Sequence, residues 1–131
     1  MRYSAKVLHY FNDPTHVGIL PEDSLSVGTG KVGTLASGDV VQLQIEVHNN
    51  SITAAKFQAQ ASPVTIAVCA WMSEWLAKKP LTTAQTLSKN EIMLALELPV
   101  LKQHCILLVV QALQIALADY ASKQLKQTHP Y

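Results

Sequence analysis

The chain has 131 residues, with 10 basic and 9 acidic side chains, five histidines and two cysteines. A chain of this length buries a core large enough to fold as one domain without disulfides or a structural metal. Two cysteines are too few for a disulfide framework, and the scattered basic residues form no stripe that would attract a phosphate backbone. We therefore expect a single domain over residues 1–131 and no nucleic-acid partner.

The cellular compartment is predicted from both the N-terminus and the apolar runs. The opening MRYSAKVLHY lacks the order of charged, apolar and small residues of a secretory signal. The longest apolar run, residues 106–110, is followed by Gln111 and Gln114, well short of the roughly 20 residues of a membrane span. We expect a soluble, cytoplasmic protein with no membrane partner.

The N-terminal third predicts one helix and one irregular strand. Residues 3–11 favour a short helix, with Ser4 near its start and Asn12-Asp13-Pro14 stopping it. Residues 27–35, VGTGKVGTL, carry enough Val, Thr and Leu to form a strand in spite of their glycines.

The clearest strand covers residues 41–47, where apolar side chains alternate with polar ones at the period of a strand with one wet face. Residues 48–51, His-Asn-Asn-Ser, predict a turn because Asn tolerates left-handed dihedral angles. A further strand over residues 52–59 would then complete a meander of two or three antiparallel strands.

The second half changes to helical periodicity. Ser62-Pro63 is a helix-start signal, so we expect a helix over residues 63–78, apolar on most sides and lying between the sheet and another helix. Thr82-x-x-Gln85 and Ser88-x-x-Glu91 both match capping boxes and predict two short helices.

Pro99 precedes the longest predicted element, a helix over residues 100–126. Its apolar stripe recurs at helical spacing through Leu101, Cys105, Leu108, Ala112 and Ile115. Residues 124–131 carry no pattern at their end and are expected to fray. Strands followed by helices predict an α+β fold, an antiparallel three-stranded sheet packed against helices with a long C-terminal helix.

Several segments resemble the IscU/NifU-type iron-sulfur cluster assembly scaffolds. The resemblance covers residues 3–123 and rests on Gly38-Asp39, on His104-Cys105, and on the Leu-Pro and Lys that precede that pair. It includes VGTGKVGTLASGDVVQLQIEV, ITAAKFQAQASPVTIAVCAWMSEWLAKK and ALELPVLKQHC.

The resemblance implies a site for a [2Fe-2S] cluster. Scaffolds of this kind use three cysteines, helped by an aspartate after the first and a histidine before the third. In this chain Ser37 and Ser62 stand at the first two cysteine positions, whereas Asp39, His104 and Cys105 match the pattern. Cys69 does not replace the second cysteine, because seven residues of helix place it about 10 Å further along.

The two serines weaken the expected cluster site. Iron-sulfur clusters are held by soft, anionic thiolates, with histidine as an occasional replacement, and a serine hydroxyl rarely ionises near neutral pH. Ser62 can instead cap the helix that follows it, and Ser37 can bond its own backbone within a tight turn.

The remaining oxygen, nitrogen and sulfur ligands leave several occupants open. Asp39, His104 and Cys105 are candidates for iron or a weakly held [2Fe-2S] cluster, or for zinc with water or Ser62 as a fourth ligand. The competing interpretation is that no metal binds, because Cys105 lies on the apolar stripe and free cysteines are commonly buried as small hydrophobes.

The resemblance also implies partners. Such scaffolds receive sulfur from a cysteine desulfurase and transfer the cluster with the help of chaperones. Leu98, Pro99, Val100, Leu101 and Lys102 are similar to the family's chaperone-recognition motif, Leu-Pro-Pro-Val-Lys, but depart from it at Val100 and Leu101. An extended peptide in a chaperone groove depends on proline-fixed dihedrals, so the loss of one proline affects this expectation.

Three functions follow from these patterns. The first is a scaffold that binds iron or a cluster transiently, with ligands from one chain or two; the oligomeric state stays open. The second is a degenerate paralogue that acts as a partner-binding or regulatory module, with or without zinc. The third, an enzyme or a zinc protein using Cys105 as nucleophile or ligand, ranks last because neither a catalytic triad nor a second metal motif is visible, and we expect no enzymatic activity.

Overall fold

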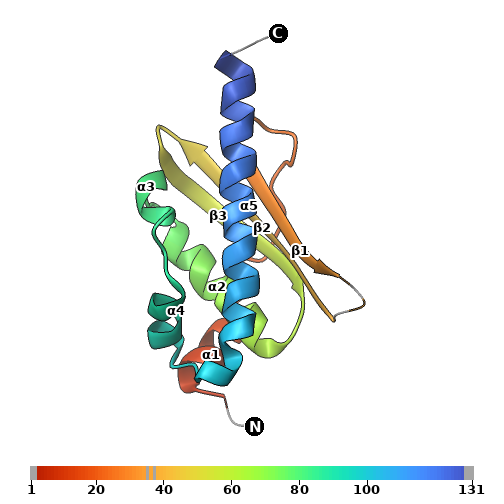
Figure 1. Ribbon diagram of the computed structural model, residues 1–131, viewed down its shortest axis with the longest axis vertical. Coiled ribbons are helices and arrows are strands. Elements are labelled where there is room, and N and C mark those ends of the chain that lie inside the picture. Colours follow the sequence, from red (N-terminus) through yellow and green to blue (C-terminus); the bar gives the residue numbers. More distant parts are fainter. Residues whose placement is uncertain (1–2, 35, 37, 129–131) are drawn as a thin grey trace.

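The computed structural model describes residues 3–34, 36 and 38–128. Three antiparallel strands form one sheet in the order β1-β2-β3, namely β1 (Val27–Thr34), β2 (Asp39–His48) and β3 (Ser51–Gln60). The α-helices of the described residues are α1 (Ala5–Phe11), α2 (Pro63–Leu76), α3 (Leu81–Ala84), α4 (Lys89–Leu96) and α5 (Gln103–Thr128). A 3-10 turn, η2 (Val100–Lys102), precedes α5. The predicted α+β fold is confirmed (Figure 1).

The helix starts follow local capping chemistry, with one exception. Ser4, Ser62 and Ser88 each accept a hydrogen bond from a backbone N–H in the first turn of α1, α2 and α4, as expected of N-cap serines. The capping box predicted at Thr82 is wrong. Thr82 lies inside α3, whose N-cap is Pro80, and no side chain caps that helix.

The helix ends differ from the sequence expectation at two places. Helix α2 ends at Leu76 rather than at residue 78, because Ala77 leaves the helical conformation with a ψ of 126° and Lys78 adopts a positive φ of 73°. Helix α5 continues to Thr128, so residues 124–128, which we expected to be frayed, are helical in the structure. Residues 129–131 lie outside the described part of the chain.

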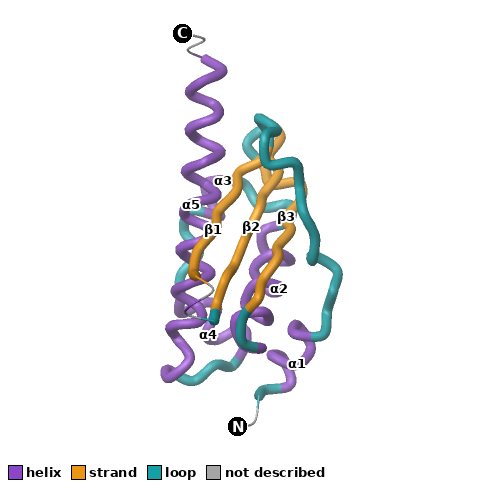
Figure 2. The backbone as a smooth tube through the Cα atoms, turned by 90° about the vertical axis from the view of Figure 1, so that its right-hand side faces the viewer, coloured by secondary structure: helices purple, strands orange, loops and turns teal. Residues whose placement is uncertain are grey.

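Helices α2 and α5 pack against one face of the sheet (Figures 1 and 2). The alternating side chains Val41, Leu43 and Ile45 of β2 point to that face and are fully buried. They join a core to which α2 contributes Ala67, Val68 and Met72 and α5 contributes Ile106, Val109 and Ala112. The hydrophobic alternation of β2 therefore decides which face the helices cover.

The opposite face of the sheet is partly covered by the connection between α1 and β1 (Figure 2). Gln44, on the polar side of β2, is only 1% exposed. Its amide donates to the Leu20 carbonyl at 2.9 Å and to Thr29 Oγ1 at 3.0 Å, and its Oε1 accepts from the Leu20 backbone N–H at 2.7 Å. These bonds satisfy a buried amide and fix the connection against the sheet.

Two glycines of β1 let α5 approach the sheet at backbone distance. A Cβ atom at Gly30 would lie 1.9 Å from the Ala112 carbonyl oxygen, and one at Gly28 would lie 2.2 Å from the Ala116 carbonyl oxygen. No side chain fits at either position, because the obstructing atoms belong to the helix backbone. The small residues Ala112 and Ala116 on the helix side complete this close contact.

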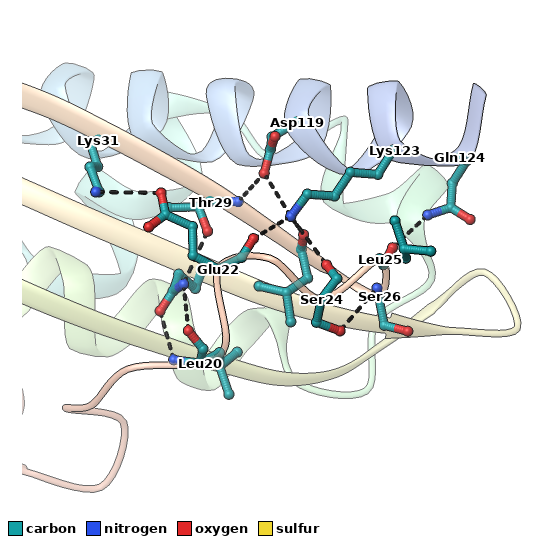
Figure 3. Close-up of polar contacts among 12 residues, drawn as sticks. Leu20, Glu22, Ser24, Leu25, Ser26, Thr29, Lys31, Asp119, Lys123 and Gln124 are labelled. Atoms are coloured by element: carbon teal, nitrogen blue, oxygen red, sulfur yellow. Dashed lines mark hydrogen bonds and ion pairs between the residues drawn. The ribbon is translucent and has the colours of Figure 1, made fainter. Parts of the chain in front are cut away.

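A polar cluster attaches the C-terminal half of α5 to the edge of β1 (Figure 3). Lys123, whose side chain is 15% exposed, donates to the carbonyl oxygens of Glu22, Ser24 and Val27 at 2.6, 3.1 and 2.7 Å. Asp119 pairs with Lys123 at 3.4 Å and accepts from the Thr29 backbone N–H at 2.9 Å. Edge groups that would otherwise be open to another strand are thereby satisfied.

The segment Val100–Gln127 is long and apolar enough to cross a membrane by length and composition alone. Contrary to the expectation from the sequence, Gln111 and Gln114 therefore do not by themselves exclude a membrane span. In the structure this segment supplies Ile106, Val109 and Ala112 to the core against the sheet, which is the packing of a core helix.

Replacement of Gly30 by alanine tests the contact between α5 and β1. We expect Gly30→Ala to lower the free energy of unfolding by about 1–3 kcal/mol or more, because the added methyl group displaces α5 from the sheet. Gly18→Ala is the matched control, since its Cβ would meet only the flexible Lys56 side chain at 3.4 Å. Equal urea midpoints for the two variants would contradict the backbone contact.

Replacement of Lys123 tests the edge cluster. Lys123→Met keeps the apolar stem but leaves three carbonyl oxygens without their donor, so we expect a loss of about 1–3 kcal/mol in thermal or urea unfolding. Lys126→Met, three residues further along α5, is expected to stay within about 0.5 kcal/mol of the parent protein. A loss in Lys126→Met as large as in Lys123→Met would show that the cluster has no specific role.

Candidate functional site

Three chain segments that are distant in sequence meet at one end of the sheet. They are the start of β2 at Asp39, the N-terminus of α2 at Ser62, and the first turn of α5 at His104 and Cys105. Gly38 enters β2 with a φ of +83°, which favours glycine and turns the chain into the strand. Asp39 contacts Ser62, and Ser62 contacts Cys105, so the three segments are joined in series.

Asp39 is tied to the N-terminus of α2. Its Oδ1 accepts a hydrogen bond from the Ser62 backbone N–H at 3.1 Å, across a sequence separation of 23 residues. A carboxylate at this position also interacts favourably with the positive end of the α2 dipole. Asp39 thus links the connection between β1 and β2 to the start of the helix.

Ser62 serves as the cap of α2 and also lies beside Cys105. Its Oγ accepts from the Thr65 backbone N–H at 3.4 Å, lies 3.1 Å from Thr65 Oγ1, and lies 3.9 Å from Cys105 Sγ. The structure therefore places a hydroxyl next to the sulfur, at the position where the resemblance implies the second cysteine of a scaffold.

His104 and Cys105, which are predicted ligands, lie side by side in the first turn of α5. His104 is exposed, and its Nε2 lies 3.5 Å from Cys105 Sγ, whereas Cys105 is only 4% exposed. The sulfur is therefore covered by Ser62 on one side and by the His104 ring on another. An exposed imidazole changes rotamer readily, so it can open access to the sulfur.

The structure brings the predicted ligands to one region without joining them into a finished metal site. Among the described residues, no three His, Cys, Asp or Glu side chains are arranged to hold one metal ion. Asp39 contacts Ser62, and Ser62 contacts Cys105, but the carboxylate is directed to a backbone N–H. Ser37, the other serine that the resemblance places at a cysteine position, lies outside the described residues.

Cys69 lies away from this region, as the helical spacing predicts. It belongs to α2, seven residues after Ser62, which is about 10 Å along the axis. Its side chain is fully buried, and desolvation raises the pKa of its thiol far above the usual value. A thiol that resists ionisation is a poor metal ligand, so Cys69 is a core residue.

The segment from Leu98 to Lys102 is not fully extended. Pro99 has extended dihedrals, but residues 100–102 form the 3-10 turn η2 that leads into α5. Leu98 packs against the core, whereas Val100 and Leu101 are 66% and 84% exposed. To bind in a groove as an extended peptide, this segment would have to unwind the turn next to His104.

Two contacts of the site have little or no signal in the sequence. Thr65 supports the Ser62 hydroxyl, and only its spacing of three residues after a cap hints at this role. Lys89 of α4 donates to Gln103 Oε1 at 2.9 Å and so fixes the residue that precedes His104. No local pattern could have predicted this contact, because α4 and α5 meet only in the folded chain.

Comparisons with known proteins agree with the fold and with the motifs. The family model of the NifU-like N-terminal domain matches residues 2–127 of this sequence. The iron-sulfur cluster assembly scaffold protein IscU of Haemophilus influenzae is 42% identical over 125 residues, covering 95% of this chain and 99% of the relative. The IscU scaffold protein of Escherichia coli K12 is 38% identical, covering 95% and 98%.

A solved structure has the same fold. A putative iron-sulfur cluster assembly scaffold protein for the SUF system from Fervidobacterium islandicum AW-1 superposes with a TM-score of 0.66 at 22% identity, covering 88% of this chain and 96% of that one. The resemblance predicted from Gly38-Asp39 and His104-Cys105 is confirmed. The chain belongs to the NifU-like N-terminal domain family, which it shares with the IscU scaffold proteins.

Proposed function

We propose that this protein works in iron-sulfur cluster assembly as a weak or transient scaffold, which binds iron or a [2Fe-2S] cluster as cargo. The observation that carries the proposal is the convergence of Asp39, Ser62 and Cys105 on one end of the sheet, with His104 beside the sulfur. The family membership supplies the reaction class. In this role the protein would act as a scaffold and would have no catalytic activity of its own.

The donors present would bind iron less tightly than three thiolates. Cys105 supplies one soft ligand and His104 one imidazole, both of which suit iron or zinc. Ser62 offers a neutral hydroxyl, a poor partner for iron near neutral pH. Since Asp39 already accepts a hydrogen bond from the Ser62 backbone, it would have to reorient to reach a metal. The arrangement supports brief retention of the cargo and ready release.

The proposed partners follow from this role. A cysteine desulfurase would deliver sulfur to the end of the sheet where Cys105 lies, and cluster-transfer chaperones would engage the exposed Val100 and Leu101. Both partners remain predictions from the family resemblance, and a cytoplasmic location remains a prediction from the cysteine content and the N-terminal sequence.

A second function is favoured by one specific observation, that no three ligand side chains converge among the residues described. A chain that keeps the assembly fold but has two serines at ligand positions would suit a partner-binding or regulatory module, with zinc at His104 and Cys105 or with no metal. Metal and sulfide content distinguish this function from the first.

The first test is elemental analysis with an absorption spectrum on protein purified without oxygen. For the scaffold we expect iron with acid-labile sulfide in the parent protein and in Cys69→Ala, and neither in Cys105→Ala, because only Cys105 lies at the site. Zinc alone, or no metal, in the parent protein would contradict the scaffold and favour the partner-binding module.

The second test restores one thiol. We expect Ser62→Cys to retain iron and sulfide longer than the parent protein during anaerobic dialysis against a chelator. The reason is that Ser62 Oγ lies 3.9 Å from Cys105 Sγ, so a cysteine at residue 62 would add a second sulfur ligand beside the first. Ser62→Ala is the matched control. Both variants lose the hydroxyl cap of α2, worth about 1 kcal/mol, but only the cysteine adds a thiolate. Equal retention in the two variants would mean that the geometry does not place residue 62 at the metal.

A further inference from the structure

A depression with a volume of about 430 Å³ lies where α1, α2 and α4 meet, at the end of the molecule that holds the N-terminus (Figure 1). It is lined by Ala5, Lys6, His9 and Tyr10 of α1, Trp71 of α2 and Ala95 of α4. None of these residues belongs to the candidate site at Cys105. The proposed function therefore gives the depression no role.

The depression has one large aromatic wall and small side chains beside it. Ala5 and Ala95 contribute only methyl groups and leave the space open. Trp71 is partly buried against the core and stacks on Trp75, with ring centroids 6.2 Å apart and an interplanar angle of 19°. An indole ring that is supported from behind and borders an open space is suited to stacking on a planar ligand.

The α1 side of the depression carries basic groups. Lys6 and His9 are exposed and both line the space. Lys6 pairs with Glu97 at 3.7 Å, but both side chains are more than half exposed, so this ion pair is weak. An ammonium group has three donors and can bind a second carboxylate while it keeps the first, and the imidazole N–H of His9 can donate as well.

The acidic groups near the depression are engaged elsewhere. No carboxylate is among the described residues that line the space. Glu74 accepts a hydrogen bond from the Tyr10 hydroxyl at 2.5 Å. This hydrogen bond is the main cause that raises the pKa of Tyr10 to about 12, so the phenol stays neutral near pH 7. The charge at the wall of the depression is therefore positive.

We infer that this depression is a binding site for a small aromatic carboxylate, whose ring stacks on Trp71 and whose carboxylate pairs with Lys6 and His9. The aromatic wall selects a planar ring, and the basic groups select a carboxylate over an amine. A few polar groups placed beside an apolar surface are the usual composition of a small-molecule site. The inference goes beyond the proposed function and requires no bound iron.

The test is a titration of ¹⁵N-labelled protein with indole-3-acetate, followed by nuclear magnetic resonance. The chain has two tryptophans, so it gives two indole Nε1–H signals, and Trp71→Phe identifies the signal of Trp71. We expect this signal to shift with a Kd of about 1 mM, as is typical of a ligand of this size. Tryptamine has the same ring but an ammonium group, and we expect it to bind at least about threefold more weakly.

Two variants test the charge and the space separately. We expect Lys6→Gln to bind indole-3-acetate about threefold more weakly, whereas Lys126→Gln, at an exposed lysine near the end of α5, binds like the parent protein. Ala95→Leu fills the depression and separates the ligand from the Trp71 ring, so we expect at least about fivefold weaker binding. Ala118→Leu, at an exposed alanine of α5, is its matched control.

Three results would each overturn the site. They are a Trp71 signal that does not shift with indole-3-acetate, equal or tighter binding of tryptamine, and parent-like binding by Ala95→Leu. The exposed position of Lys6 means that Lys6→Gln is expected to fold normally, which an unchanged thermal unfolding midpoint checks. All of these results leave the scaffold function intact, because no residue that lines the depression is a predicted metal ligand.

Discussion

The backbone contact between α5 and β1 is the constraint on which the rest of the structure depends. Gly28 and Gly30 leave no room for a side chain, so the helix rests on the strand at Ala112 and Ala116. The polar cluster of Asp119 and Lys123 then fixes the helix along its axis by binding the edge of β1 and the connection before it. Together these contacts determine the position of the first turn of α5.

The position of the site follows from that placement. His104 lies eight residues before Ala112, about 12 Å along the helix axis, at the end of the sheet where β2 begins and α2 starts. Asp39 reaches the Ser62 backbone there, and Ser62 reaches Cys105. The fold therefore brings together the start of β2, the start of α2 and the first turn of α5, the segments in which the family resemblance predicts ligands.

The two serines change the chemistry at this point more than the architecture. Ser62 keeps a structural role as the cap of α2, which a thiol would fill less well, and this role explains how the helix start survives the replacement. What the region lacks is further sulfur ligands, because Cys105 is the one cysteine side chain found there among the described residues, and iron-sulfur clusters are held mainly by sulfur. If His104 and Cys105 bind iron as proposed, one sulfur and one imidazole would suit cargo that leaves easily.

The sequence by itself determined the elements that depend on local chemistry. The sequence correctly predicted the alternation of β2, the cap at Ser62 and the periodicity of α5. These features are local, because burial on one face and capping act over a few residues. It failed at Thr82 and at the end of α2, where packing and a positive φ at Lys78 override a local motif. Motifs at Gly38-Asp39 and His104-Cys105 were enough to indicate the family.

Only the tertiary structure decided the contacts that join distant segments. Nothing local to Asp39 indicates that its carboxylate binds the Ser62 backbone, and nothing local to Gly30 indicates that a helix backbone covers it. The same holds for the role of Lys123, whose three carbonyl partners lie 96 to 101 residues earlier in the chain. Such contacts depend on how whole elements pack, and a sequence pattern of a few residues carries no information about them.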